Sequence, residues 1–154
     1  MEPIKRESFA KYAFLYVLTL GLYDVIFMYK MGKHVNAICY GDSKAMRSFV
    51  LAKIIKKLAL ALILAAGSVG GSIAIAVLAF PCIVYEKYWY YTLGERMKKR
   101  CPDYGFKISE GGYDFFLLSF LPLMGPFFIA GIMINNINRL ADNSKKGYYA
   151  DTVA

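Results

Sequence analysis

The feature that most constrains this chain is a run of 28 residues, 58–85, without a charged side chain. A helix needs about 20 apolar residues to cross roughly 30 Å of hydrocarbon. A helix of this length in a water-soluble protein would carry charges on the face that meets solvent. The run therefore predicts an all-α integral membrane protein. Its length allows one full span, or a tight hairpin at residues 67–72, which are mostly glycine and serine.

Two further apolar segments flank this run. Residues 13–31 are interrupted by Asp24, and residues 115–134 contain Pro122 and Pro126. Both segments are near the lower length limit for a membrane span. We therefore expect about three hydrophobic segments, which are full spans or broken and re-entrant, each followed by an amphipathic helix.

The sequence repeats itself weakly. A shift of 62 residues places Tyr23–Cys39 over Tyr85–Cys101 and aligns Asp24 with Glu86, and a fainter third copy follows. The expected domain is a single helical membrane domain, residues 1–142, with copies at about 10–39, 72–101 and 113–141, and with a mobile polar tail at 143–154.

Each copy contains a helix breaker and then an amphipathic stretch. The breakers lie near Gly21, Pro81 and Pro122–Pro126. Glycine and proline weaken or kink helices, through backbone entropy and a lost N–H group respectively. The apolar stripes that follow are Met28, Met31, Val35 and Ile38 in the first copy, Trp89, Leu93 and Met97 in the second, and Ile129, Met133, Ile137 and Leu140 in the third.

Several of these motifs resemble a known family. They are T-L-G-L-Y at 19–23, Y-W-Y-Y-T-L-G-E-R at 88–96 and I-N-N-I-N-R-L-A-D at 134–142. Together they are similar to bacterial small membrane proteins of the domain-of-unknown-function family 4234. The likeness covers about residues 10–142. It implies helices in a bacterial inner (cytoplasmic) membrane, multi-pass or re-entrant, and it implies no reaction.

The distribution of lysine and arginine does not select one topology. Cytoplasmic loops of membrane proteins carry the excess of these residues. Three simple spans would place nine basic residues on one side and ten on the other. If each apolar segment instead enters the membrane and returns at its breaker, all the basic stretches share one side. Both arrangements stay open.

Four polar residues are candidates for a functional role inside the membrane. Asp24 and Glu86 lie beside apolar helix, where acidic groups are costly and often functional. Alternatively, both lie at headgroup level and pair with nearby lysines, Lys30 or Lys87. Asn135 and Asn138 could hold helices together or line a polar pore.

The basic and aromatic residues predict contact with lipid. The net charge is +8, which would also suit nucleic acid, but the charge lies beside apolar segments and favours anionic headgroups. The expected lipid-surface residues are Lys53, Lys56, Lys57, Arg96, Lys98, Lys99 and Arg100. Tyr88, Trp89, Tyr90 and Tyr91 have the composition of an interfacial aromatic belt.

No motif predicts an enzyme. The sequence has no G-x-S-x-G, H-E-x-x-H or P-loop pattern. One histidine, His34, and three cysteines without C-x-x-C spacing do not predict a metal site, so we expect neither metal nor cofactor.

We therefore expect an interaction protein that binds anionic lipid or a protein partner through its basic amphipathic helices. The alternative is an oligomeric channel or small transporter that uses Asp24, Glu86 and the asparagines. A homo-oligomer is also expected, because the small residues at 67–72 offer a close-packing face.

Overall fold

The computed structural model describes residues 6–38, 46–65, 69–121 and 124–145. Within these ranges every regular element is helical, which confirms the predicted all-α fold. The elements are α1 (Phe9–Leu18), α2 (Tyr23–Ile38), α3 (Met46–Ala65), α4 (Val69–Arg100), a 3₁₀ turn η1 (Cys101–Tyr104), α5 (Gly112–Leu118) and α6 (Met124–Lys145).

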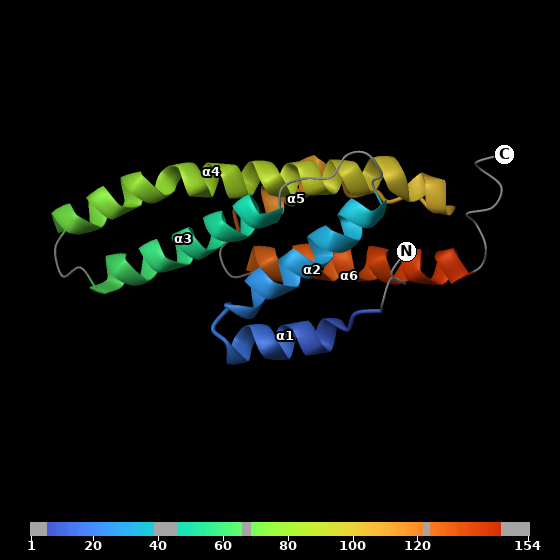
Figure 1. Cartoon of the computed structure of the whole chain (residues 1–154), viewed down its shortest axis with the longest axis horizontal. Helices are drawn as coiled ribbons and strands as arrows, with labels where there is room; N and C mark the ends of the chain where they lie inside the picture. Colours follow the sequence, from blue (N-terminus) through green and yellow to red (C-terminus); the bar gives the residue numbers. More distant parts are fainter. Residues whose placement is uncertain (1–5, 39–45, 66–68, 122–123, 146–154) are drawn as a thin grey trace.

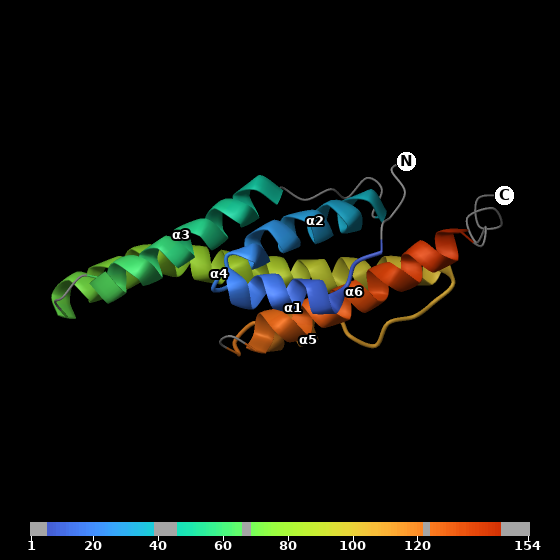
Figure 2. The ribbon, with the colours of Figure 1, turned by 90° about the horizontal axis from the view of Figure 1, so that it is seen from below.

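The helices form three antiparallel hairpins, α1/α2, α3/α4 and α5/α6, that point the same way (Figures 1 and 2). Each first helix runs toward one side of the molecule, the chain reverses, and the second helix returns. The C-terminal ends of α2, α4 and α6 therefore lie together at the opposite side, which we call the broad end. The turn of each hairpin is called its tip below.

The α3/α4 hairpin extends beyond the tips of the other two (Figure 1). We call its projecting part, residues 58–65 and 72–84, the arm. A rise of 1.5 Å per residue makes α1 about 15 Å long and α4 about 48 Å long. The hairpins thus point in one direction but reach different depths.

The broad end contains the apolar core. Its buried residues include Met28, Met31 and Val35 of α2, Trp89, Leu93 and Met97 of α4, and Ile129, Met133, Ile137 and Leu140 of α6. These are the three predicted stripes, except that Ile38 has no described side chain. The helical periodicity of the sequence therefore identified the faces that pack together.

The predicted break near Gly21 is confirmed. α1 ends at Leu18 and α2 begins at Tyr23, and Leu20 and Gly21 have positive φ values of 49° and 81°. Glycine adopts this backbone conformation without the steric cost that a Cβ atom brings. The Thr19 hydroxyl accepts a hydrogen bond from the Tyr23 N–H at 2.8 Å, which closes the turn.

The predicted break near Pro81 is wrong, because α4 continues through that residue. A proline inside a helix removes one main-chain hydrogen bond and typically costs about 3 kcal/mol or more. Pro81 is exposed, and residues on both sides of it pack α4 along α3. We attribute the continuity of the helix to this contact.

The third break is present between Leu118, the last residue of α5, and Met124, the first of α6. Pro122 lies outside the described residues, and Pro126 lies in the first turn of α6, where a proline displaces no helical hydrogen bond. The end of α6 at Lys145 also places three residues of the predicted tail in a helix. The rest of that tail is outside the described residues.

The long uncharged run forms part of a helical hairpin rather than one continuous helix. It is divided between α3, which ends at Ala65, and α4, which begins at Val69. The Ser72 hydroxyl donates to the Ile63 carbonyl at 3.5 Å across the hairpin, and Ala59 and Ala79 are buried. Small residues at such positions let two helices approach closely.

One helical stretch in the described part of the chain, Ser72–Tyr104, is long and apolar enough to cross a membrane. Only 17% of its most apolar window is buried inside the molecule. A membrane location therefore has support from length and composition.

Candidate functional site: a buried network of ion pairs

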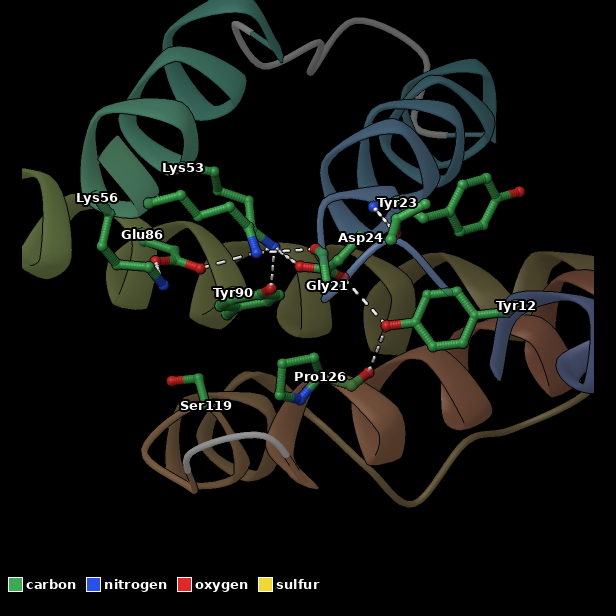
Figure 3. Close-up of polar contacts among 12 residues, drawn as sticks. Tyr12, Gly21, Tyr23, Asp24, Lys53, Lys56, Glu86, Tyr90, Ser119 and Pro126 are labelled. Carbon is green, nitrogen blue, oxygen red and sulfur yellow. Dashed lines mark hydrogen bonds and ion pairs between the residues drawn. The ribbon is translucent and has the colours of Figure 1, made fainter. Parts of the chain in front are cut away.

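Three charged side chains from three helices of two hairpins meet inside the molecule (Figure 3). Asp24 comes from the first turn of α2, Lys53 from the middle of α3 and Glu86 from α4. Each is at least 97% buried. Lys53 forms an ion pair with Asp24, and its Nζ lies 3.6 Å from Glu86 Oε1. The two acidic residues that the repeat aligns therefore share one lysine.

Two tyrosine hydroxyl groups complete the surroundings of this pair. Lys53 Nζ donates a hydrogen bond to Tyr90 Oη at 2.7 Å. Tyr12 Oη donates to Asp24 Oδ1 at 3.2 Å and also lies 3.5 Å from the Pro126 carbonyl oxygen. Asp24 and Tyr90 accept hydrogen bonds from the Lys53 ammonium group, and Glu86 adds an ion-pair contact at 3.6 Å. The buried lysine thus exchanges water for two hydrogen bonds and a second negative charge.

A second lysine balances the charge of the network. Lys56 pairs with Glu86 from the next turn of α3, and its side chain is 34% exposed. The network then contains two carboxylates and two ammonium groups. A buried charge without a partner is far more costly than a paired one. The second lysine therefore allows two acidic groups to share one interior site.

Two further lysines bind the tips of the short hairpins. Lys57 of α3 donates to the Gly21 carbonyl at 2.8 Å, at the turn between α1 and α2. Lys87 of α4 donates to the Ser119 carbonyl, at the turn after α5. The long hairpin thus satisfies a main-chain acceptor in each of the other two. Turns that lie away from water need such partners.

This arrangement can act as a brace between the hairpins. The described residues contain no group of three or more histidine, cysteine, aspartate or glutamate side chains suited to a metal ion. The buried carboxylates each bind a lysine, and the network connects α1, α2, α3, α4 and α6 through hydrogen bonds. Its evident effect is to fix the positions of the three hairpins relative to one another.

The structure brings together Asp24 and Glu86 but uses different lysines from those considered at the sequence level. The partners are Lys53 and Lys56, whereas Lys87 binds a main-chain carbonyl. The sequence predicts Lys53 on a lipid-facing surface, and this prediction is wrong because the side chain is buried. The helical positions Phe49, Ala52 and Lys53 show why, because they share one buried face of α3.

The basic cluster at the end of α4 is divided in a similar way. Arg96 is buried and donates to the Asn36 side-chain oxygen at 2.8 Å, so it is not a surface residue. Lys98, Lys99 and Arg100 are exposed at the broad end. The surface charge predicted for this stretch therefore comes from three residues rather than four.

The four residues of the predicted aromatic belt, 88–91, are also divided between the surface and the interior. Tyr88 and Tyr91 are 59% and 40% exposed. Trp89 and Tyr90 are buried, and Trp89 stacks on Phe49 with ring centroids 3.9 Å apart. Half of the proposed belt therefore belongs to the α3–α4 contact, and the other half remains on the surface.

The asparagines do not act as one cluster. Asn135 is exposed, while Asn138 accepts from the Glu7 N–H and donates to the Glu7 carbonyl, both at 2.9 Å. These two hydrogen bonds attach the segment before α1 to α6. Asn138 thus holds parts of the molecule together, which is the first of the two roles considered for it.

Sequence reasoning missed Tyr12 and gave other roles to Lys57 and Lys87, the two lysines that bind the hairpin tips. Tyr12 is 1% exposed and contacts the rings of Phe27 and Phe127, with centroids 4.4 and 5.9 Å away. Nearly every residue of α1 is apolar or aromatic, whether exposed or half-buried, so no helical stripe marks Tyr12. Lysines that bind main-chain carbonyls leave no pattern in the sequence at all.

Comparison with known proteins identifies one related family. The sequence model described as "Domain of unknown function (DUF4234)" matches residues 7–99, which is more than half of the chain. No curated protein and no solved structure shows significant similarity. The match covers α1 to α4 almost completely, and therefore includes Asp24, Lys53 and Glu86.

Proposed function

The chain belongs to the family Domain of unknown function (DUF4234), and from this premise we propose that it is a non-enzymatic inner-membrane protein that binds anionic lipid. In this proposal the three hairpins enter the membrane from the cytoplasmic side, and the broad end stays among the headgroups. The activity is binding through exposed basic residues at that end.

The observation that carries the proposal is an exposed apolar surface along α4 whose length matches the thickness of a membrane. Exposed apolar and aromatic residues follow α4 as far as Tyr91, and the first exposed charged residue after it is Lys98. Tyr91 lies 22 residues from Val69, the first residue of α4, which corresponds to about 33 Å of helix. This distance matches the roughly 30 Å thickness of the hydrocarbon layer.

The exposed basic residues support binding of the broad end to anionic headgroups. In the described part of the chain they are Arg6, Lys11, Lys30, Lys33, Lys98, Lys99, Arg100, Lys107 and Arg139. Each basic residue near an anionic surface contributes about 1 kcal/mol to binding. Because the hairpins share one direction, these residues gather on one side instead of being divided between two.

An apolar groove between α4 and α5 supports contact with acyl chains. Its volume is about 540 Å³, and its lining includes Phe80, Val84, Tyr88, Tyr113 and Phe120. Four of these five side chains are more than half exposed, and Val84 is 50% exposed. Such a surface is favourable in hydrocarbon and unfavourable in water.

The alternative of a channel or transporter receives less support. A conducting path would require Asp24 or Glu86 to face water, but both are 3% exposed and paired with lysine. Asn138 is occupied by the main chain of Glu7. Asp24, Glu86 and Asn138 are thus committed to contacts within the protomer, and Asn135 is exposed on α6.

Cysteine labelling in intact cells tests the membrane arrangement. In a variant whose native cysteines are replaced, a cysteine at Lys98 should react only from the cytoplasm, and one at Leu22 should be protected from both sides. Leu22 lies at the tip of the α1/α2 hairpin and is 61% exposed. Reaction of the two positions from opposite sides would indicate a simple span and contradict the re-entrant arrangement.

Lipid exchange tests the binding partner. Replacing Lys98, Lys99 and Arg100 with glutamine should reduce enrichment of anionic over zwitterionic lipid around the purified protein, at about 1 kcal/mol per charge. The matched control replaces Lys98 and Lys99 with arginine, which keeps the charge and should keep the enrichment. Equal enrichment by the glutamine variant would exclude these residues as the lipid-binding surface.

A protein partner and a homo-oligomer remain predictions. Of the small-residue run that suggests an oligomer, residues 69–72 belong to the first turn of α4, and Ser72 donates to Ile63 of the facing helix in the same chain. Mass measurement in nanodiscs tests assembly, and a monomer in several lipid compositions would contradict the homo-oligomer.

A further inference from the structure

The cross-section of the molecule changes abruptly along its long axis. At the tips of α1/α2 and α5/α6 those hairpins end, and α3 and α4 continue as the arm (Figures 1 and 2). Nine large apolar residues of the arm are at least half exposed: Leu58, Leu60, Leu62, Leu64, Ile73, Val77, Leu78, Phe80 and Val84. The molecule is therefore wide on one side of the tips and narrow on the other.

The helix lengths place this change near the middle of a bilayer. α1 has 10 residues and α5 has 7, which correspond to about 15 and 10 Å. Half of a hydrocarbon layer of roughly 30 Å is about 15 Å. Neither helix can pass beyond one leaflet, whereas the arm continues. Past Lys57, which binds the Gly21 carbonyl, α3 extends eight more residues, about 12 Å.

We propose that the protein acts as a wedge that senses membrane curvature, with its broad part in one leaflet and only the arm in the other. This inference rests on the proposed membrane insertion. A body that occupies more area in one leaflet is favoured where that leaflet is convex, because convex leaflets expose more space between headgroups. The protein is thus expected to concentrate on membranes that bulge toward the side of its broad end.

The internal contacts give the wedge the stiffness that it needs. A hairpin that could fold away would not resist the lateral pressure of lipid. The α1/α2 tip is attached to the arm's base through Lys57 and through the Asp24–Lys53 ion pair. The α5/α6 hairpin is attached through Lys87.

The start of α5 is additionally packed directly on the main chain of α4. A Cβ atom placed on Gly94 would lie 2.6 Å from the Gly111 carbonyl oxygen, so only glycine permits this approach. The closeness of the two backbones fixes the position of the α5/α6 hairpin against the long one. Both short hairpins are therefore held at a defined depth.

The test is insertion into vesicles of two sizes. The full chain is synthesised without cells in the presence of a mixture of small and large phosphatidylcholine vesicles, so that it inserts from outside. Protein per lipid is then measured on single vesicles by two-colour fluorescence. We expect at least about a twofold higher density on the small vesicles, equivalent to ~0.4 kcal/mol. A symmetric single-helix transmembrane peptide is the control and should show no size dependence.

The outcomes separate the wedge from membrane insertion itself. Equal density on both sizes overturns the wedge and leaves insertion intact. Failure to float with either vesicle overturns the proposed function as well. A size preference that appears only when anionic lipid is added also overturns the wedge, because a preference due to shape does not need charge.

A second variant probes stiffness directly. Replacing both Lys57 and Lys87 with methionine releases the two tips but keeps the apolar surface. The variant should still insert, and its density ratio between small and large vesicles should fall toward one. An unchanged ratio would contradict the claim that the locked tips make the wedge.

Discussion

The two halves of α3 have opposite character although they belong to one helix. From Phe49 to Lys57 the helix carries three lysines, and Lys53 is 1% exposed. From Leu58 to Ala65 it carries no charge, and Leu64 is 80% exposed. In the first half the lysines bind partners within the protein, and in the second half apolar side chains form the surface.

This contrast reverses the arrangement of a water-soluble protein. Lysine is almost never fully buried unless it is paired, and large contiguous apolar patches are rare on soluble monomers. In hydrocarbon the preferences change, because exposed leucine has no cost and an ionised side chain needs protein partners. The difference between the halves therefore supports lipid as the medium around the arm. The following variants test each half.

The largest effect is expected from Lys53→Met. The substitution leaves Asp24 without its lysine inside the protein, and breaking a buried ion pair in this way costs about 3–5 kcal/mol. The midpoint of unfolding, followed by circular dichroism in detergent, should fall strongly. Ile54→Met is the matched control, because its neighbouring side chain is 46% exposed and should tolerate the change. Equal stability of the two variants would show that the network does not hold the hairpins.

A charge in the arm should have the next largest effect. Leu78 is 79% exposed, so lysine would be harmless there if the arm faced water. In the middle of a membrane the same lysine costs about 2.5–3.5 kcal/mol of insertion free energy. Leu78→Lys should therefore lower the fraction of protein recovered in membranes. Asn135→Lys, at an exposed position of α6, should leave this fraction unchanged, and equal behaviour would place the arm in water.

A moderate effect is expected at the hairpin tip that α3 supports. Lys57→Met removes the donor to the Gly21 carbonyl, and a hydrogen bond to a charged group contributes about 1.5 kcal/mol or more. Thermal unfolding in detergent should occur at a lower temperature. Lys57→Arg retains a donor and should recover most of the loss. If arginine behaved like methionine, the length of the side chain rather than its hydrogen bond would be important.

The smallest effect is expected for an ion pair far from both halves of α3. Arg6 pairs with Asp142 at 2.5 Å, and both side chains are exposed, 66% and 39%. Exposed ion pairs contribute at most about 1 kcal/mol. Arg6→Ala should change the unfolding midpoint little, and high salt should remove even that difference. A loss as large as that of Lys53→Met would mean that the segment before α1 supports the whole fold.

The sequence predicted those parts of the structure that follow from periodicity and from backbone chemistry. The stripes of Met31, Leu93 and Ile137 pointed to the core, and Gly21 marked a turn that requires positive φ. The predicted break at Pro81 is wrong because packing along α3 outweighs the local tendency of proline to interrupt a helix. Such tertiary contacts are not visible in a local pattern.

The candidate site was predicted only in part for a related reason. Asp24 and Glu86 stood out because charge beside apolar helix is unusual. Lys53, Lys56 and Lys57 do share one face of α3, as their spacing of three and four residues requires. Which partners that face meets depends on where α2 and α4 pack, and a local sequence pattern does not contain that information.

The common direction of the hairpins also has a consequence for how such a chain could be made. On the proposed arrangement, every charged residue that the structure describes stays on the side of the membrane where the chain is synthesised or within the protein. The parts that must approach the opposite surface are the end of α3 at Ala65 and the start of α4 at Val69, which both lie inside the uncharged run 58–85. Insertion would then require no lysine, arginine or carboxylate to be moved across the hydrocarbon layer. The three hairpins can enter from one side, in any order, and lock together afterwards through their lysines.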